Sequence, residues 1–141
     1  MMPYEFIGYT MINSTGITAI VGATSLSRIT HGSRPQSSAL STLPAINYYE
    51  LGGVTRRNGM GAQSFSINCR ATTPGAARKL AEKVLDCFCG SSGTGMYGTN
   101  NNFTVARSSL RNDNGLIPEP DSSAFNAPID IQIVYALSTV S

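Results

Sequence analysis

Charged side chains are scarce in this sequence of 141 residues. Asp, Glu, Lys and Arg make up 13% of it, about half of the roughly 25% that is usual in globular proteins. The net charge is only +2, and the longest basic run is the pair Arg56–Arg57, which argues against a nucleic-acid-binding domain with a strongly basic face. A surface so poor in charge is easier to explain if much of it is buried against other subunits.

Histidine and cysteine are also scarce, with one histidine and three cysteines. His31 has no acidic residue near it in the sequence, so a local catalytic triad is unsupported and we expect a turn residue. Cys87 and Cys89, if helical, project about 200° apart, and Cys69 falls on the apolar side of a predicted strand, as a small core residue does. We therefore expect no catalytic residue, no cofactor and no metal ion.

Two alternatives of a different class stay open. The cysteines and His31 could form a small metal-binding module, although their spacing matches no zinc finger or ribbon. A small enzyme could use His31 or a cysteine as its nucleophile. The glycine-rich run GSSGTG after Cys89 does not support a phosphate site, because it follows a predicted helix and phosphates bind where helices begin.

Neither a secretory leader nor a membrane span is predicted. The N-terminus lacks a basic region and carries Glu5 early, unlike a signal peptide. Phe6–Ser27 is free of charge but broken by polar residues, whereas a span needs about 20 predominantly apolar residues. We expect a soluble protein with free thiols, made in a reducing compartment, and a single domain over residues 1–141.

Helical patterns occur at the N-terminus and in the middle of the chain. Apolar spacing predicts a short helix over Tyr4–Ile12 and a second one that begins at Ser14 or Thr15, so that residues 1–25 form a helical N-terminus. A longer amphipathic helix is predicted from Pro74, capped by Thr72 or Thr73. Its apolar stripe consists of Ala77, Leu80, Ala81, Val84, Leu85 and Phe88.

Alternating apolar and polar residues predict four strands, over residues 43–53, 64–71, 102–110 and 129–137. Long loops are expected at 52–63, 90–102 and 111–128. Residues 26–141 thus form the core of an α+β fold. We predict an antiparallel sheet of about four strands with one long amphipathic helix packed on one face, and short N-terminal helices.

Five charged residues are candidates for contacts with a partner. Arg56 and Arg57 lie at the predicted tip of a hairpin, just before the turn signal Asn58-Gly59, where a basic tip would touch a partner chain or a DNA backbone. Arg111, Glu119 and Asp121 belong to the long 111–128 connection, and long loops in compact domains are often binding segments.

Four segments follow one another in order between Arg28 and Leu137, a span that covers most of the chain. A short helical N-terminus leads to RITHGSRPQ and to LPAINYYELGG, then QSFSINCRATTPGAARKLAEKVLDCF follows, and FNAPIDIQIVYAL closes the arrangement. From Arg28 to Leu137 this order and spacing resemble the tail-completion or tail-terminator proteins of long-tailed bacteriophages. In that family a segment ending in Arg-x-Pro-Gln or similar precedes an LPxI strand, and another strand leads into an A..LA..V helix. The longer 111–128 connection and the SSGTGMYGTNNN loop depart from the simpler members.

The resemblance implies an α+β protein that closes into a ring, expected to be a hexamer, on the head-proximal end of the tail tube. Such a ring stops tube polymerisation and joins the tube to neck and head-completion proteins, while DNA passes through its lumen as cargo. It implies a virion protein made in the host cytoplasm, with no enzymatic activity and no membrane partner. The five charged residues then become partner or lumen contacts. A neck or head-completion adaptor is the alternative role.

Overall fold

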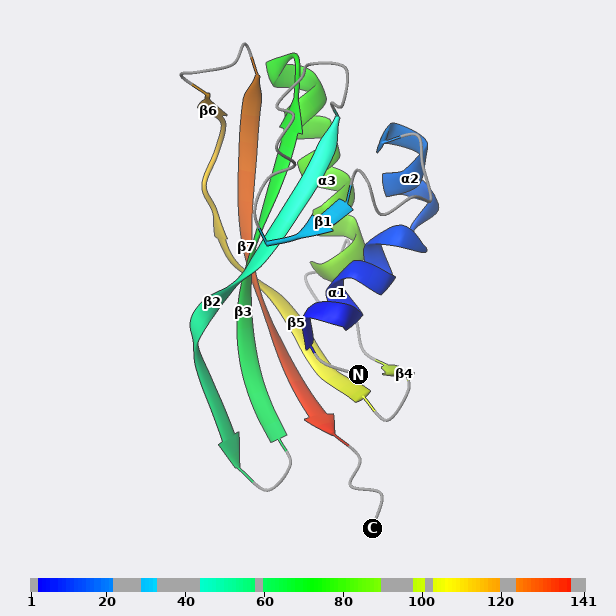
Figure 1. Cartoon of the computed structure of the whole chain (residues 1–141), viewed down its shortest axis with the longest axis vertical. Coiled ribbons are helices and arrows are strands. Elements are labelled where there is room, and N and C mark those ends of the chain that lie inside the picture. The colour runs from blue at the N-terminus through cyan, green and yellow to red at the C-terminus, as the bar shows by residue number, and fades with distance from the viewer. Residues whose placement is uncertain are drawn as a thin grey trace.

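The computed structural model describes residues 3–21, 29–32, 44–57, 60–89, 98–100, 103–119 and 124–137. Helices and strands alternate irregularly along the described chain (Figure 1). Their bounds are α1 Pro3–Ile12, α2 Thr15–Val21, β1 Ile29–His31, β2 Ala45–Arg57, β3 Met60–Ala71, α3 Pro74–Cys89, β4 Gly98–Asn100, β5 Phe103–Asp113, β6 Ile117–Pro118 and β7 Phe125–Leu137.

The strands form one mixed sheet of seven strands. Six follow the order β1-β2-β3-β7-β5-β4, and β6 pairs with the beginning of β7. Among the described strands, only β1 pairs in parallel, with β2, and the other pairs are antiparallel. The α+β class is confirmed, but the prediction of about four purely antiparallel strands is wrong. The additional strands have two or three residues, too few for an alternating pattern to reveal them.

Strands occupy most of the predicted 52–63 loop and part of the predicted 111–128 loop. In place of a 52–63 loop, β2 and β3 continue until Arg57 pairs with Met60; Asn58 and Gly59 lie outside the described residues. In place of a 111–128 loop, β5 extends to Asp113, β6 follows, and β7 begins at Phe125. Part of the predicted 90–102 loop is strand β4, and the remainder of that range lies outside the described residues.

An irregularity in β2 explains why its sequence pattern indicates a turn. Leu51 pairs with Ser64 and Thr55 pairs with Ala62, so residues 52–54 stand opposite Gln63 alone. The Gln63 side-chain amide donates to the backbone carbonyl of Leu51, an acceptor beside the interrupted ladder. A bulge of this kind bends a strand without ending it.

The predicted starts of α2 and α3 are confirmed, and the structure shows which of the two candidate residues caps each helix. Ser14 Oγ accepts the N–H of Ile17 at 3.4 Å before α2, and Thr73 Oγ1 accepts the N–H of Ala76 at 3.2 Å at the start of α3. Such caps satisfy N–H groups that have no partner within the helix. The helical N-terminus is likewise confirmed within residues 3–21.

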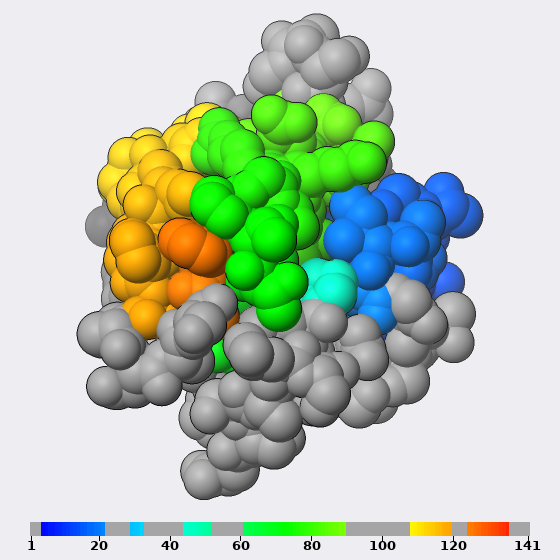
Figure 2. Space-filling view, turned by 90° about the horizontal axis from the view of Figure 1, so that it is seen from above, coloured from blue at the N-terminus to red at the C-terminus, as the bar shows by residue number. Residues whose placement is uncertain are grey.

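The core lies between the helices and one face of the sheet (Figure 1). Helix α3 packs on β3, β7 and β5, and α1 packs on β1. Close approach of α1 to β2 requires a glycine, because a Cβ at Gly8 would lie 2.4 Å from the Tyr48 hydroxyl oxygen. The N-terminal helices and the β5–β6 region occupy opposite sides of the molecule (Figure 2). The largest fully buried side chains are Ile7, Met11, Ile17, Ile46, Phe65, Ile67, Leu80, Phe88, Ile129, Ile131 and Tyr135.

Candidate functional site

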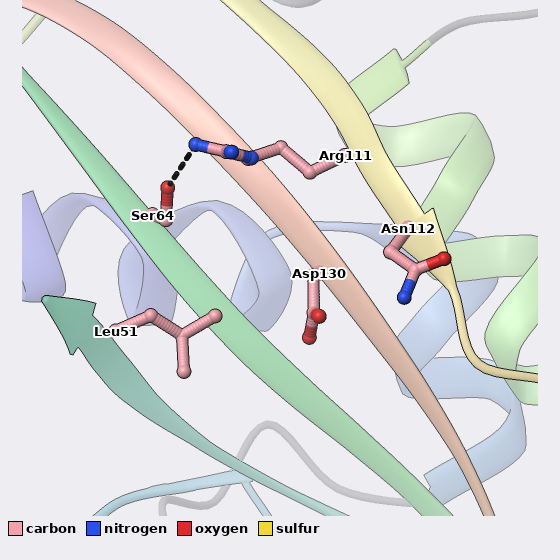
Figure 3. Close-up of a pocket in the computed structure, with 5 residues that line it drawn as sticks. All are labelled: Leu51, Ser64, Arg111, Asn112 and Asp130. Carbon is pink, nitrogen blue, oxygen red and sulfur yellow. Dashed lines mark hydrogen bonds between the residues drawn. The ribbon is translucent and has the colours of Figure 1, made fainter. Parts of the chain in front are cut away.

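The sheet face that points away from α3 carries a polar hollow of about 450 Å³ (Figure 3). Alternation along the strands creates this face: Phe65 and Ile131 point into the core, so their neighbours Ser64 and Asp130 point the other way. The hollow is lined by Leu51, Ser64, Arg111, Asn112 and Asp130. It therefore spans β2, β3, β7 and β5.

Arg111, one of the predicted partner contacts, is exposed and lines the hollow. It sits at an irregularity of β5, between the pairs Leu110–Ile131 and Asn112–Asp130. Its Nη1 donates to the Ser64 hydroxyl at 3.3 Å (Figure 3). Among the described residues its guanidinium has no ion pair, so the cation is available to a partner. The contact itself stays a prediction.

The described residues that line the hollow carry hydrogen-bonding groups. Among the described residues, its lining offers a guanidinium, a carboxylate, an amide and a hydroxyl, with no histidine or cysteine. Within the described ranges, no group of three or more His, Cys, Asp and Glu side chains could hold a metal ion. These groups can donate and accept hydrogen bonds.

Glu119, predicted as a partner contact, lies buried within the chain. Its carboxylate accepts two hydrogen bonds from Arg70, at 2.6 Å from Nε and 2.8 Å from Nη2. The strand pattern predicts Arg70 on a solvent-facing side, yet its side chain is only 3% exposed. The pair joins β3 to the segment that follows β6, so the carboxylate of Glu119 stabilises this chain internally.

The remaining predicted contact residues lie in two places. Arg56 and Arg57 are the last residues of β2 and pair with Gly61 and Met60. This end of the β2–β3 hairpin extends away from α3 (Figure 1). Asp121 lies outside the described residues.

His31 lies in strand β1, so the prediction of a turn residue is wrong. Its Nε2 contacts a carboxylate oxygen of Glu50, and its ring stacks on Tyr4 with centroids 4.3 Å apart and planes 9° apart. The ring centroid of Tyr48 lies 5.2 Å from that of His31. The parallel register of β1 and β2 pairs His31 with Tyr48 and brings Glu50 near, a juxtaposition that no local spacing indicates.

The His31 cluster resembles a catalytic arrangement only in part. Its hydroxyl groups belong to Tyr4 and Tyr48, and burial, with Glu50 nearby, raises the pKa of Tyr48 to about 12. That phenol stays protonated near neutral pH and is a weak nucleophile. The Tyr4–His31 stacking instead holds α1 against β1, and the Glu50 contact holds β1 against β2.

The three cysteines are free thiols. Cys87 and Cys89 both lie in α3 as predicted, and Cys69 and Cys89 are buried. Burial raises the pKa of all three thiols, that of Cys87 to about 11. Since the thiolate is the reactive form, these environments favour packing over chemistry.

Comparison with known proteins identifies a shared fold. No family model matches the sequence, and no curated protein matches it either. Within the described residues, no helix is long and apolar enough to cross a membrane. A chain in the solved structure "Virion of native gene transfer agent (GTA) particle" superposes with a TM-score of 0.58 at 11% identity, over 92% of this chain and 91% of that one. The protein therefore shares its fold with a chain of a virion, over nearly the full length of both.

Proposed function

We propose that the protein is a structural component of a phage-like virion and that it acts as a tail terminator. In this role, copies form a ring, expected to be a hexamer, that caps the head-proximal end of the tail tube and joins it to the neck. The observation that carries the proposal is the superposition on a virion chain, because it covers 92% of one chain and 91% of the other. A likeness of this extent concerns the whole domain rather than one shared motif.

The surface chemistry supports a scaffold. The chain has few charges, the described residues that line its polar hollow include no histidine or cysteine, and burial raises the pKa of its thiols. We infer that the protein is not an enzyme and works without a cofactor or metal. Its partners would be its own copies, the tail-tube protein and the neck or head-completion proteins, with DNA only passing through.

Native mass spectrometry tests the ring. We expect a discrete closed oligomer, with the hexamer as the main species, that persists on dilution to micromolar concentration. A strict monomer at every concentration would contradict the ring. An open series of growing oligomers would also contradict it, because head-to-tail contacts that do not close produce fibres.

The specific role is tested by adding the purified protein to polymerising tail-tube protein and measuring tube lengths by electron microscopy. A terminator is expected to shorten the tubes as its concentration rises and to bind only one tube end. A matched capture experiment compares immobilised tail-tube protein with immobilised neck protein. Capture by the neck protein alone, with unchanged tube lengths, would favour the neck or head-completion adaptor.

A further inference from the structure

The sheet has an open strand edge on each side. On one side, β1 pairs only with Ile46–Tyr48 of β2. On the other side, β4 pairs only with Phe103–Val105 of β5. Within the described ranges, β2 has no strand paired with its outer edge after Tyr48. Likewise, β5 has no strand paired with its outer edge after Val105. Such edges are templates for pairing with another chain unless something covers them.

The side chains near the two edges differ in character. The β5 surface, defined here as Leu110, Arg111, Leu116 and Ile117, is aliphatic and basic. Its Leu110 is 43% exposed and its Ile117 47% exposed, although each is a side chain that normally seeks burial.

The opposite edge is aromatic and acidic. The β2 surface, defined here as Tyr9, Tyr49 and Glu50, has Tyr9 52% exposed and Tyr49 41% exposed. Helix α1, which carries Tyr9, packs on β1 at this edge. The described residues of this region, 3–21, 29–32 and 44–51, contain two glutamates and no lysine or arginine.

The two surfaces are complementary in charge, and the N-terminal helices and the β5–β6 region lie on opposite sides of the molecule (Figure 2). Joining two β2 surfaces would bring like charges together, which costs free energy, whereas joining a β2 surface to a β5 surface brings Glu50 toward Arg111. A contact between two different surfaces is head-to-tail, the type that generates rings when the rotation closes.

Arg111 is suited to reach a neighbour. It lies at an irregularity of β5, where strands re-aim side chains. The hydrogen bond that it makes is a 3.3 Å contact to the neutral Ser64 hydroxyl. A carboxylate acceptor forms a shorter and stronger bond with a guanidinium than a neutral hydroxyl does. Because a carboxylate can accept from more than one donor, Glu50 can receive Arg111 while it contacts His31.

Resting on the ring of the proposed function, we propose that neighbouring copies join head-to-tail, the β5 surface of one copy against the β2 surface of the next, with Arg111 beside Glu50. The aliphatic side chains of the β5 surface then pack on Tyr9 and Tyr49. The occupant of each surface is a second copy of this chain.

Charge reversal tests the contact. Arg111→Glu and Glu50→Arg, made singly, each place like charges in every interface, and we expect roughly a hundredfold rise in the concentration needed for half assembly. Mixing the two variants provides the decisive test, because a ring in which they alternate has opposite charges in every interface. One interface then joins the two reversed side chains, and the next joins the unchanged Arg111 to the unchanged Glu50. Assemblies with an even number of chains, half of each variant, are expected in native mass spectra.

Matched controls reverse charges on the exposed face of α3, with Lys79→Glu and Glu82→Arg, and are expected to assemble like the unchanged protein. Circular dichroism and thermal unfolding establish that each variant is folded. The neutral variants Arg111→Gln and Glu50→Gln remove one charge without reversing it and are expected to weaken assembly less.

The outcomes separate the contact from the ring. The contact is overturned, and the ring left intact, if the wild type assembles and the charge-reversal variants assemble equally well. The same conclusion follows if the two reversal variants fail to assemble with each other when they are mixed. A wild type that is monomeric at every concentration overturns the ring and this contact with it.

Discussion

Arg70 and Glu119 form a buried, two-pronged ion pair between the centre of the sheet and the segment after β6. The two hydrogen bonds measure 2.6 and 2.8 Å, and the side chains are 3% and 5% exposed. A buried charge is tolerated only when it is paired and hydrogen-bonded. The segment that carries Glu119 is therefore fixed to β3 by electrostatics, while its neighbour Ile117 faces solvent.

Removing one partner of this pair should destabilise the protein strongly. We expect Glu119→Ala to lower the free energy of unfolding by about 3–5 kcal/mol, because Arg70 is left buried and unpaired. The double variant Arg70→Met with Glu119→Leu should recover most of the loss. Urea denaturation measures both, with Lys79→Ala on the exposed side of α3 as control. Equal losses in the single and double variants would mean that the charges themselves are not the cause.

The contact between Gly8 and Tyr48 gives a second prediction. A Cβ at position 8 would lie 2.4 Å from the Tyr48 hydroxyl oxygen, so Gly8→Ala should displace α1 or the ring and cost about 1–3 kcal/mol. Tyr48→Phe in the same chain removes that oxygen and should restore part of the stability. Gly75→Ala, where no atom lies within 4 Å, is the matched control. Thermal unfolding that gave equal losses for both alanines would refute the steric cause.

Asp113 gives the stability a dependence on pH. Its side-chain hydrogen bonds to Arg78, at 2.9 and 2.6 Å, lower the pKa of Asp113 below its ordinary value of 3.8. A lowered folded pKa means that the stabilisation is present above the unfolded pKa and is lost as the pH falls through the folded pKa. The side chains of Arg78 and Asp113 are partly exposed, at 41% and 28%, so we expect only about 0.5–1 kcal/mol.

The measurement compares urea denaturation of the wild type and of Asp113→Asn at pH 6 and at pH 2. The wild type should be more stable than the variant at pH 6, and the difference should shrink at pH 2. A difference that stayed constant between the two pH values would show that the asparagine disturbs packing rather than an ion pair.

The thiols should react slowly in the folded protein. Burial raises the pKa of Cys87 to about 11 and raises that of Cys69 as well, so little thiolate exists at pH 8. With Ellman's reagent we expect a slow reaction in buffer and a fast reaction of all three cysteines in urea. A thiol that reacts rapidly in the native protein would favour the enzyme alternative. Stoichiometric zinc in an elemental analysis would favour the metal-binding module.

The main elements of the fold follow from local patterns. In helix α3 and in the central strands, apolar side chains recur with the period of a helix or of a strand. In β3, for example, the buried residues Phe65, Ile67 and Cys69 alternate along the strand. Strand β1 has no such signal, because three residues hold their conformation only through pairing with β2. The bulge opposite Gln63 likewise breaks the pattern at glycines that elsewhere indicate turns.

The candidate site was predictable only in part. Arg111 could be selected as a charged residue in a region between strong strands, and it is exposed as expected. The burial of Arg70 has no local signal in the sequence. Alternation places Arg70 on the same side of β3 as the polar residues Ser66 and Asn68, which is the side expected to face solvent, yet all three residues are buried. The contact between His31 and Glu50 arises from the register of a parallel pair, which sequence spacing does not encode.

The position of β7 in the sheet has a consequence for the order of events during synthesis. β7 is the last strand of the described chain, yet it lies between β3 and β5 and pairs with both. Until it has emerged from the ribosome, β3 and β5 cannot take their final spacing. The edges of β2 and β5 therefore reach their final separation late, and a half-made chain does not yet present the two surfaces that would let it join a neighbour. Contacts between strands so distant in the sequence are also slow to form, which favours completion of each copy before assembly.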